Sequence, residues 1–133
     1  MFRFIHTADW QLGKPYAWAE PEVRSALTDA RFDAIDTIGK LANEHSATHV
    51  LVAGDVFDTE GPDPRTIVQA LSRMERHACH WWLLPGNHDF VRAGGLWDRI
   101  EARLPGNVYL ISEAQPSELE GGMWLLPAPL VHR

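Results

Sequence analysis

The chain has 133 residues, of which 45% are hydrophobic and 23% are charged, and its formal net charge is −6. This size and composition are typical of one folded domain and exclude a disordered or fibrous protein. Its ten arginines and two lysines are scattered, so the basic stripe of an electrostatic nucleic-acid binder is absent, whereas an acidic balance suits a site for divalent cations.

The chain has one cysteine, Cys79, which excludes an internal disulfide bond. No signal peptide and no long apolar span occurs at either end of the sequence, so we expect no membrane association. The cytoplasm is therefore the expected location.

The first predicted elements are a strand at residues 2–6, a polar loop at residues 7–19 and a helix that begins at Pro21. The helix is predicted from apolar residues at three- and four-residue steps, which we expect to face the core. These residues are Val23, Leu27, Ala30, Ala34, Ile38 and Leu41.

A second buried strand is predicted at residues 49–53, and Asp63 and Pro64 then form the cap and first turn of a second helix. The expected inward face of this helix is Ile67, Leu71, Met74 and Ala78. Further along the chain we predict a strand at 81–84, a short helix at 95–103, a strand at 108–111 and an edge strand at 123–130 that two prolines interrupt.

This alternation of strands and helices predicts an α/β fold with a largely parallel sheet flanked by helices. The chain reaches Arg133 directly after the last strand, without a helix to cover an open sheet. We therefore expect an incomplete layered domain, of which these residues form the first half.

Polar side chains follow three consecutive predicted strands. Asp9 and Gln11 follow the first strand, Asp55 and Asp58 the second, and the stretch 87–89 the third. Because ligands of open α/β sheets bind beyond the carboxyl ends of the strands, these side chains are expected at one edge.

The residue types in this group indicate metal-assisted hydrolysis. Carboxylate and amide oxygens bind hard divalent cations, and imidazole suits Mn, Fe and Zn. Cys79 lies away from these loops, and no Gly-x-Ser-x-Gly elbow, P-loop or Gly-x-Gly-x-x-Gly turn occurs in the sequence.

Three sequence blocks resemble the first three signatures of the calcineurin-like metallophosphoesterases, which read D-x-H, G-D-x-x-D and G-N-H-[DE]. The blocks are Asp9-Trp10-Gln11, Gly54-Asp55-Val56-Phe57-Asp58 and Gly86-Asn87-His88-Asp89. Within that superfamily, residues 6–13 and 53–58 most resemble the SbcD-type DNA repair exonucleases. The resemblance identifies residues 1–133 as the N-terminal portion of one calcineurin-like phosphoesterase domain.

The resemblance implies roles for the residues that match the blocks. Asp9 and Gln11 correspond to ligands of a first metal, Asp55 to a ligand that bridges two metals, and Asn87 to a ligand of the second. His88 corresponds to the histidine that protonates the leaving oxygen, and Asp89 is expected to orient it.

The same resemblance implies a cofactor, a substrate and partners. The cofactor would be two divalent metal ions, with Mn preferred and Mg, Fe or Zn as alternatives, and they would activate water for phosphodiester hydrolysis. The substrate would be DNA, cleaved as an exonuclease or endonuclease in DNA repair. The implied partners are an SbcC-like ATPase and a second copy of the chain.

The sequence departs from the family pattern in two places. Gln11 stands where the family has histidine, and an amide oxygen is a weaker donor to such a metal than imidazole nitrogen. The later histidine blocks are not found, since only His132 follows His88. A non-catalytic, truncated or degenerate module is therefore the first alternative, and a phosphatase or phosphodiesterase with a substrate other than DNA is the second.

Simpler structural roles compete with the functional ones. Asp9 and Asp55 could cap turns, and Gln11 is as well explained by an exposed surface position as by a metal. His6 is expected as a core histidine or as a support for the ligands. Asp58 is expected to brace its loop, and Trp10 and Trp18 are candidates for the wall of a substrate cleft.

Overall fold

The first four of the five predicted strands pair in the order in which they occur along the chain. The structure is a computed structural model that describes residues 1–130, so His132 lies outside the described residues. Every neighbouring pair in the order β1-β2-β3-β4 is parallel, which confirms the predicted α/β sheet. The strands are β1 (Phe4–Thr7), β2 (His49–Ala53), β3 (His80–Leu84) and β4 (Val108–Leu110).

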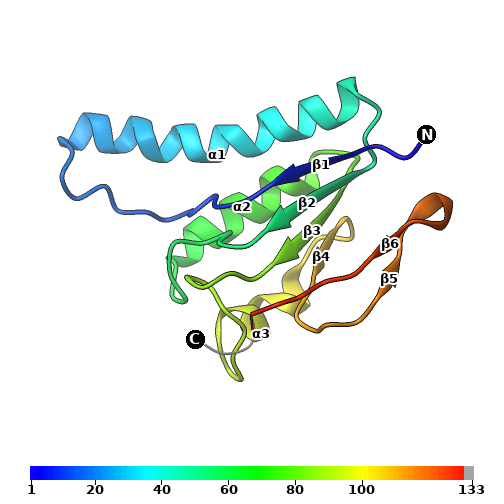
Figure 1. Ribbon diagram of the computed structural model, residues 1–133. Helices are drawn as coiled ribbons and strands as arrows, with labels where there is room; N and C mark the ends of the chain where they lie inside the picture. The colour runs from blue at the N-terminus through cyan, green and yellow to red at the C-terminus, as the bar shows by residue number, and fades with distance from the viewer. Residues whose placement is uncertain (131–133) are drawn as a thin grey trace.

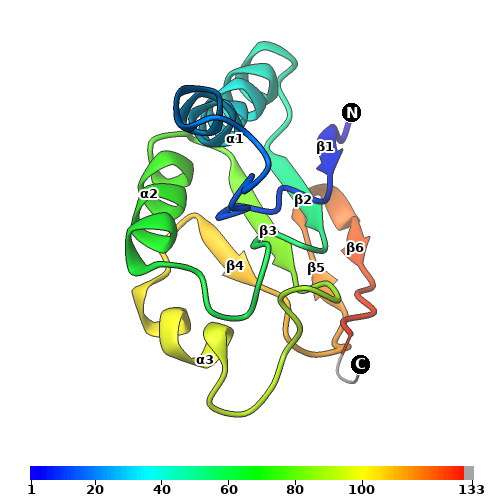
Figure 2. The same cartoon turned by 90° about the vertical axis from the view of Figure 1, so that its left-hand side faces the viewer.

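Three helices lie on one face of this sheet, as Figures 1 and 2 show. They are α1 (Pro21–Glu44), α2 (Pro64–Glu75) and α3 (Leu96–Ile100), the last continued by the 3-10 turn Glu101–Arg103. The predicted cap of α2 is confirmed, because the Asp63 carboxylate accepts a hydrogen bond from the backbone N–H of Arg65 at 2.7 Å. Within residues 1–130, each helix is too short or too polar to cross a bilayer.

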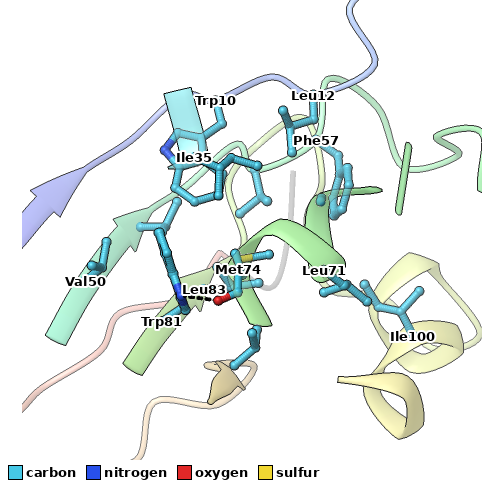
Figure 3. Close-up of a cluster of buried hydrophobic side chains, with 14 of the residues drawn as sticks. Trp10, Leu12, Ile35, Val50, Phe57, Leu71, Met74, Trp81, Leu83 and Ile100 are labelled. Carbon is cyan, nitrogen blue, oxygen red and sulfur yellow. Dashed lines mark hydrogen bonds between the residues drawn. The ribbon is translucent and has the colours of Figure 1, made fainter. Parts of the chain in front are cut away.

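The core lies between this sheet face and the helices (Figure 3). Alternate residues of β2 and β3 point into it, as a strand with one buried face requires. The indole N–H of Trp81 donates to the carbonyl oxygen of Met74 at 3.0 Å, so the largest core side chain also has its polar atom satisfied. The strand residues in this layer are Val50, Val52, Trp81 and Leu83.

The predicted inward face of α1 is wrong for most of its residues, although Ile38 is partly buried against the core. Val23 and Leu41 are 48% and 40% exposed. The buried residues are instead Phe32, Ile35, Gly39 and Ala42, which follow the same three- and four-residue steps on a neighbouring stripe. Two neighbouring rows of α1 residues have the spacing of one helix face. Which row is buried therefore depends on the elements against which the helix packs.

A short hairpin lies on the opposite face of the sheet from the helices (Figure 2). It consists of β5 (Ser117–Glu118) and β6 (Trp124–Leu125), which pair antiparallel. Of the predicted strand at 123–130, only Trp124–Leu125 forms a strand, and it pairs with β5 rather than with the main sheet. Pro127 and Pro129 follow it, as expected for residues that cannot donate to a strand ladder.

An ionic network joins α1 to α2. Asp36 on α1 accepts from Arg73 at 2.7 Å and contacts the ring of His77 at 2.9 Å. Burial alone would raise the pKa of the Asp36 carboxyl group, but the hydrogen bonds from His77 and Arg73 lower it below its ordinary value. The His77 ring packs so closely on α1 that a Cβ atom built on Gly39 would lie 2.5 Å from its Nδ1 atom.

We expect Gly39→Ala to destabilise the protein by about 1–3 kcal/mol, because the added methyl group displaces the His77 ring and breaks its contact with Asp36. Chemical denaturation measures this loss of unfolding free energy. His77→Ala in the Gly39→Ala background should recover part of it, since the clash is then removed. Additive effects of the two substitutions would contradict this explanation.

Candidate metal centre

The loops that follow β1 and β2 run side by side. The backbone N–H groups of Asp9 and Gln11 donate to the carbonyl oxygens of Gly54 and Asp55 at 3.0 and 2.9 Å. The same ladder continues as Leu12 pairs with the second loop, where Leu12 and Phe57 are both fully buried. The first two sequence blocks are thus held together by backbone hydrogen bonds at the carboxyl edge of the sheet, on the left in Figure 1.

Three of the candidate metal ligands have a left-handed backbone. Their φ angles are 56° for Asp9, 46° for Gln11 and 53° for Asp55. Such a conformation costs a non-glycine residue about 1–2 kcal/mol, and here the hydrogen bonds between the loops stabilise it. Strained backbone of this kind gathers at functional sites, where it aims particular side chains.

The loop after β3 contacts the second loop at Asp55. The backbone N–H of His88 donates to Oδ1 of Asp55 at 3.0 Å, and Asp55 is only 5% exposed. Gly86 lies against the same residue, because a Cβ atom on Gly86 would fall 2.5 Å from the Asp55 backbone nitrogen and closer still to Oδ1. Asp55 therefore lies where the three strand-end loops meet.

Asp89 has a different position from the expected one. Its carboxylate is fully buried and accepts from the backbone N–H groups of Phe57 at 3.0 Å and Gly86 at 2.7 Å. Burial raises the pKa of this carboxyl group, the two N–H donors oppose the rise, and the charge of Asp55 adds to it. Asp89 holds the second and third loops together, and both of its oxygens are engaged away from the His88 ring.

The ring of His88 is positioned by Asp58 instead. Its Nδ1 atom lies 3.0 Å from the carbonyl oxygen of Asp58, with the Asp58 carboxylate at 4.0 Å. A carbonyl oxygen can only accept, so Nδ1 carries a proton and Nε2 of the neutral ring is a free acceptor. The side chain is 39% exposed, which leaves Nε2 accessible to a substrate. The backbone carbonyl of Asp58 thus orients this histidine.

The donor types at this edge suit a hard divalent cation. Asp9 and Asn87 are exposed, and their side chains make no hydrogen bonds to the described residues. With the carboxylate of Asp55 they offer three oxygen ligands, the type that Mg and Mn prefer. Within residues 1–130, no group of three or more histidine, cysteine, aspartate or glutamate side chains is placed to hold a metal ion.

Gln11 does not fit a metal in the same way. Its Oε1 atom accepts a hydrogen bond from the ammonium group of Lys14 at 3.1 Å. This amide oxygen therefore already faces a positive charge. Sequence reasoning missed Lys14, although its position three residues after Gln11, with Gly13 between them, is a signal for a turn that brings the two side chains together.

Three other residues that the sequence singled out, His6, Trp10 and Trp18, differ in exposure. His6 is exposed rather than a core residue, and it lines a cavity of about 150 Å³ on the hairpin side of the sheet with Leu51 and Trp82. Trp10 is buried with its ring edge against Trp81, 5.8 Å between centroids, and it also lines a cavity of about 180 Å³ with Asp9 and Arg31. Trp18, by contrast, is 78% exposed.

Comparisons with known proteins show the family of the chain. The model of the calcineurin-like phosphoesterase family matches residues 2–123. The SbcD subunit of the nuclease SbcCD from Escherichia coli (strain K12) is 34% identical over 93 residues, which cover 67% of this chain and 22% of that protein. Its counterpart in the nuclease SbcCD from Bacillus subtilis (strain 168) is 32% identical over 107 residues, which cover 77% of this chain and 24% of that protein. The chain thus spans less than a quarter of the length of these relatives.

Proposed function

Because the chain belongs to the calcineurin-like phosphoesterase family, we propose that it takes part in metal-dependent phosphodiester hydrolysis of DNA, as a nuclease of the SbcD type. In this proposal, residues 1–133 form the N-terminal portion of one phosphoesterase domain. The observation that carries it is the meeting of the three strand-end loops at Asp55, which brings three oxygen donors and an accessible imidazole to one edge. The similarity to the SbcD subunit of the SbcCD nuclease supports DNA as the substrate.

The ligands in this proposal are Asp9, Asp55 and Asn87, with Gln11 as a weak additional donor. The cofactor is two divalent metal ions, with Mn preferred, because the donors are mainly oxygen atoms. When bound, such ions lower the pKa of a water molecule and neutralise charge on the phosphate. In this proposal, the left-handed backbone of Asp9 and Asp55 presets the directions of their carboxylates.

His88 is the proposed general acid. Water attacks phosphorus and gives up a proton to solvent as the ester P–O bond breaks; the leaving oxygen takes a proton from Nε2 of the His88 ring, which must first gain that proton from solvent. Asp58 keeps the proton on Nδ1 and so directs Nε2 outward. Asp89 contributes by holding the loops of Asp55 and His88 together rather than by touching the ring.

The proposed partners follow from the same similarity. They are DNA, an SbcC-like ATPase and a second copy of the chain, and a DNA substrate would place the protein in the cytoplasm. A groove of about 930 Å³ between α2 and α3 supports the contact with a second copy, since Val68 in its wall is 60% exposed. The groove is also lined by Ile67, Leu71 and Leu104, and a contiguous apolar surface, rather than one exposed residue, is a feature of association surfaces.

We expect the full-length protein to cleave linear DNA in the presence of Mn²⁺, and His88→Ala to lower kcat by about 100- to 10,000-fold because a general acid is lost. A gel assay of DNA cleavage measures this. His45→Ala is the matched control, since His45 is an exposed histidine at the end of α1.

Two other outcomes would contradict the proposal. Faster hydrolysis of a phosphoprotein or a cyclic nucleotide than of DNA would favour the phosphatase or phosphodiesterase alternative. Mn²⁺ binding without hydrolysis of any phosphoester would favour a non-catalytic module.

A further inference from the structure

We propose that the ammonium group of Lys14 acts as a built-in cation on the Gln11 side of the site, where it weakens binding of a first metal ion and contacts a phosphate oxygen of the substrate. The inference rests on the proposed function. It concerns the source of positive charge in the site. Besides metal ions, the protein itself would supply the ammonium group of Lys14.

The contact between the two side chains is set by the backbone. The N–H of Lys14 donates to the carbonyl oxygen of Gln11 at 3.2 Å, which closes a tight turn through Gly13. Gly13, the third residue of this turn, has a φ of 88°, a positive value that glycine adopts without strain. The turn brings Nζ of Lys14 to 3.1 Å from Oε1 of Gln11.

The turn is also fixed to the rest of the site. The N–H of Gln11 donates to the carbonyl oxygen of Asp55 at 2.9 Å, so the Gln11–Lys14 pair is attached to the loop that carries the central carboxylate. On its other side, Arg31 donates to the carbonyl oxygen of Trp10 at 2.6 Å. Lys14 itself is half-buried, unlike the exposed Lys40, the only other lysine of the chain.

The charge of Lys14 opposes a metal ion at Gln11. The amide oxygen is a weak metal ligand, and a lysine ammonium group cannot coordinate a metal because it has no free lone pair. A divalent cation that bound Oε1 would have to displace Lys14 and then face its positive charge at short range. A lysine in this position is thus a competitor of the metal, not a support for it.

The same charge suits a phosphate group. Lysine binds phosphate oxygen as a point charge with up to three N–H donors, and Gln11 occupies one of these. The remaining donors are available to an anionic oxygen at the edge where Asp9 and Asp55 lie. Lys14 would therefore supply part of the positive charge that the phosphate needs.

The test is titration of the full-length protein with Mn²⁺ by isothermal calorimetry. We expect one ion to bind tightly and a second at least about tenfold more weakly. Lys14→Met should tighten the second ion about tenfold or more, because it removes the charge and keeps much of the side-chain length. Adding Gln11→His to Lys14→Met should tighten it further, since imidazole is the better ligand.

Lys40→Met is the control and should leave both binding constants unchanged. In the presence of Mn²⁺, Lys14→Met should also weaken competitive inhibition by inorganic phosphate about tenfold, whereas Lys40→Met should not. Thermal unfolding of each variant checks that the fold is retained, and Lys14→Gln provides a second neutral variant.

The outcomes separate this inference from the proposed function. Two equally tight ions, with constants that Lys14→Met leaves unchanged, would overturn the role of Lys14 and leave the metallophosphoesterase proposal intact. Binding of no ion would overturn both. A weaker second ion in Lys14→Met would show that Lys14 supports the metal and would also overturn the inference.

Discussion

Replacing Asp55 by asparagine is expected to abolish tight binding of divalent cations and to lower kcat/KM for a phosphodiester by about a thousandfold or more, or about 4 kcal/mol. Asparagine keeps the shape of the side chain and an oxygen that can accept the His88 N–H, but it removes the negative charge. The loss should therefore appear in metal binding and catalysis, with a smaller change in stability.

Calorimetry with Mn²⁺ and a phosphodiesterase assay measure the two effects in the full-length protein. Asp29→Asn is the matched control, because Asp29 is an exposed aspartate on α1 that lies away from the strand-end loops. Undiminished activity of Asp55→Asn would remove the central residue from the proposed site and with it the proposed function.

Gly86→Ala is expected to destabilise the protein by about 3 kcal/mol and to weaken metal binding strongly. The new methyl group would lie 2.5 Å from the Asp55 backbone nitrogen, so the loop after β3 must move away from the loop after β2. That movement breaks the hydrogen bond from His88 to Asp55 and the one from Gly86 to Asp89.

Chemical denaturation and Mn²⁺ titration together test this expectation. Gly106→Ala is the control, since a Cβ atom on Gly106 meets nothing within 4 Å. Shortening Asp55 to alanine should fail to restore the stability of Gly86→Ala, because the clash with the backbone nitrogen remains. Wild-type stability of Gly86→Ala would show that the two loops do not approach each other this closely.

The strands were predictable because their signal is local. A short apolar run between turn residues predicts a strand from neighbouring residues alone, and β2 and β3 lie within one residue of the predicted bounds. The core-facing side of α1 was not predictable, because two apolar stripes fit its period and only the packing against α2 and the sheet selects Phe32 and Ile35. The short β5 strand carries no apolar pattern at all.

In the candidate site, too, local features were predictable from the sequence and tertiary contacts were not. Spacing and strand ends were enough to predict that Asp9, Asp55 and Asn87 follow strands that end at one edge. The sequence pattern did not predict the contacts between these side chains. Asp58, rather than Asp89, contacts the ring of His88, because the carboxylate of Asp89 is drawn inward by two backbone N–H groups.

The sequence by itself thus determined the order of the elements, the parallel sheet and the chemical types of the residues at its edge, since these depend on neighbours along the chain. Only the tertiary structure decided the buried stripe of α1, the partner of His88 and the contact of Lys14 with Gln11. These depend on packing and on competition for hydrogen-bond partners between loops that are distant in sequence, and such competition leaves no periodic signal in the chain.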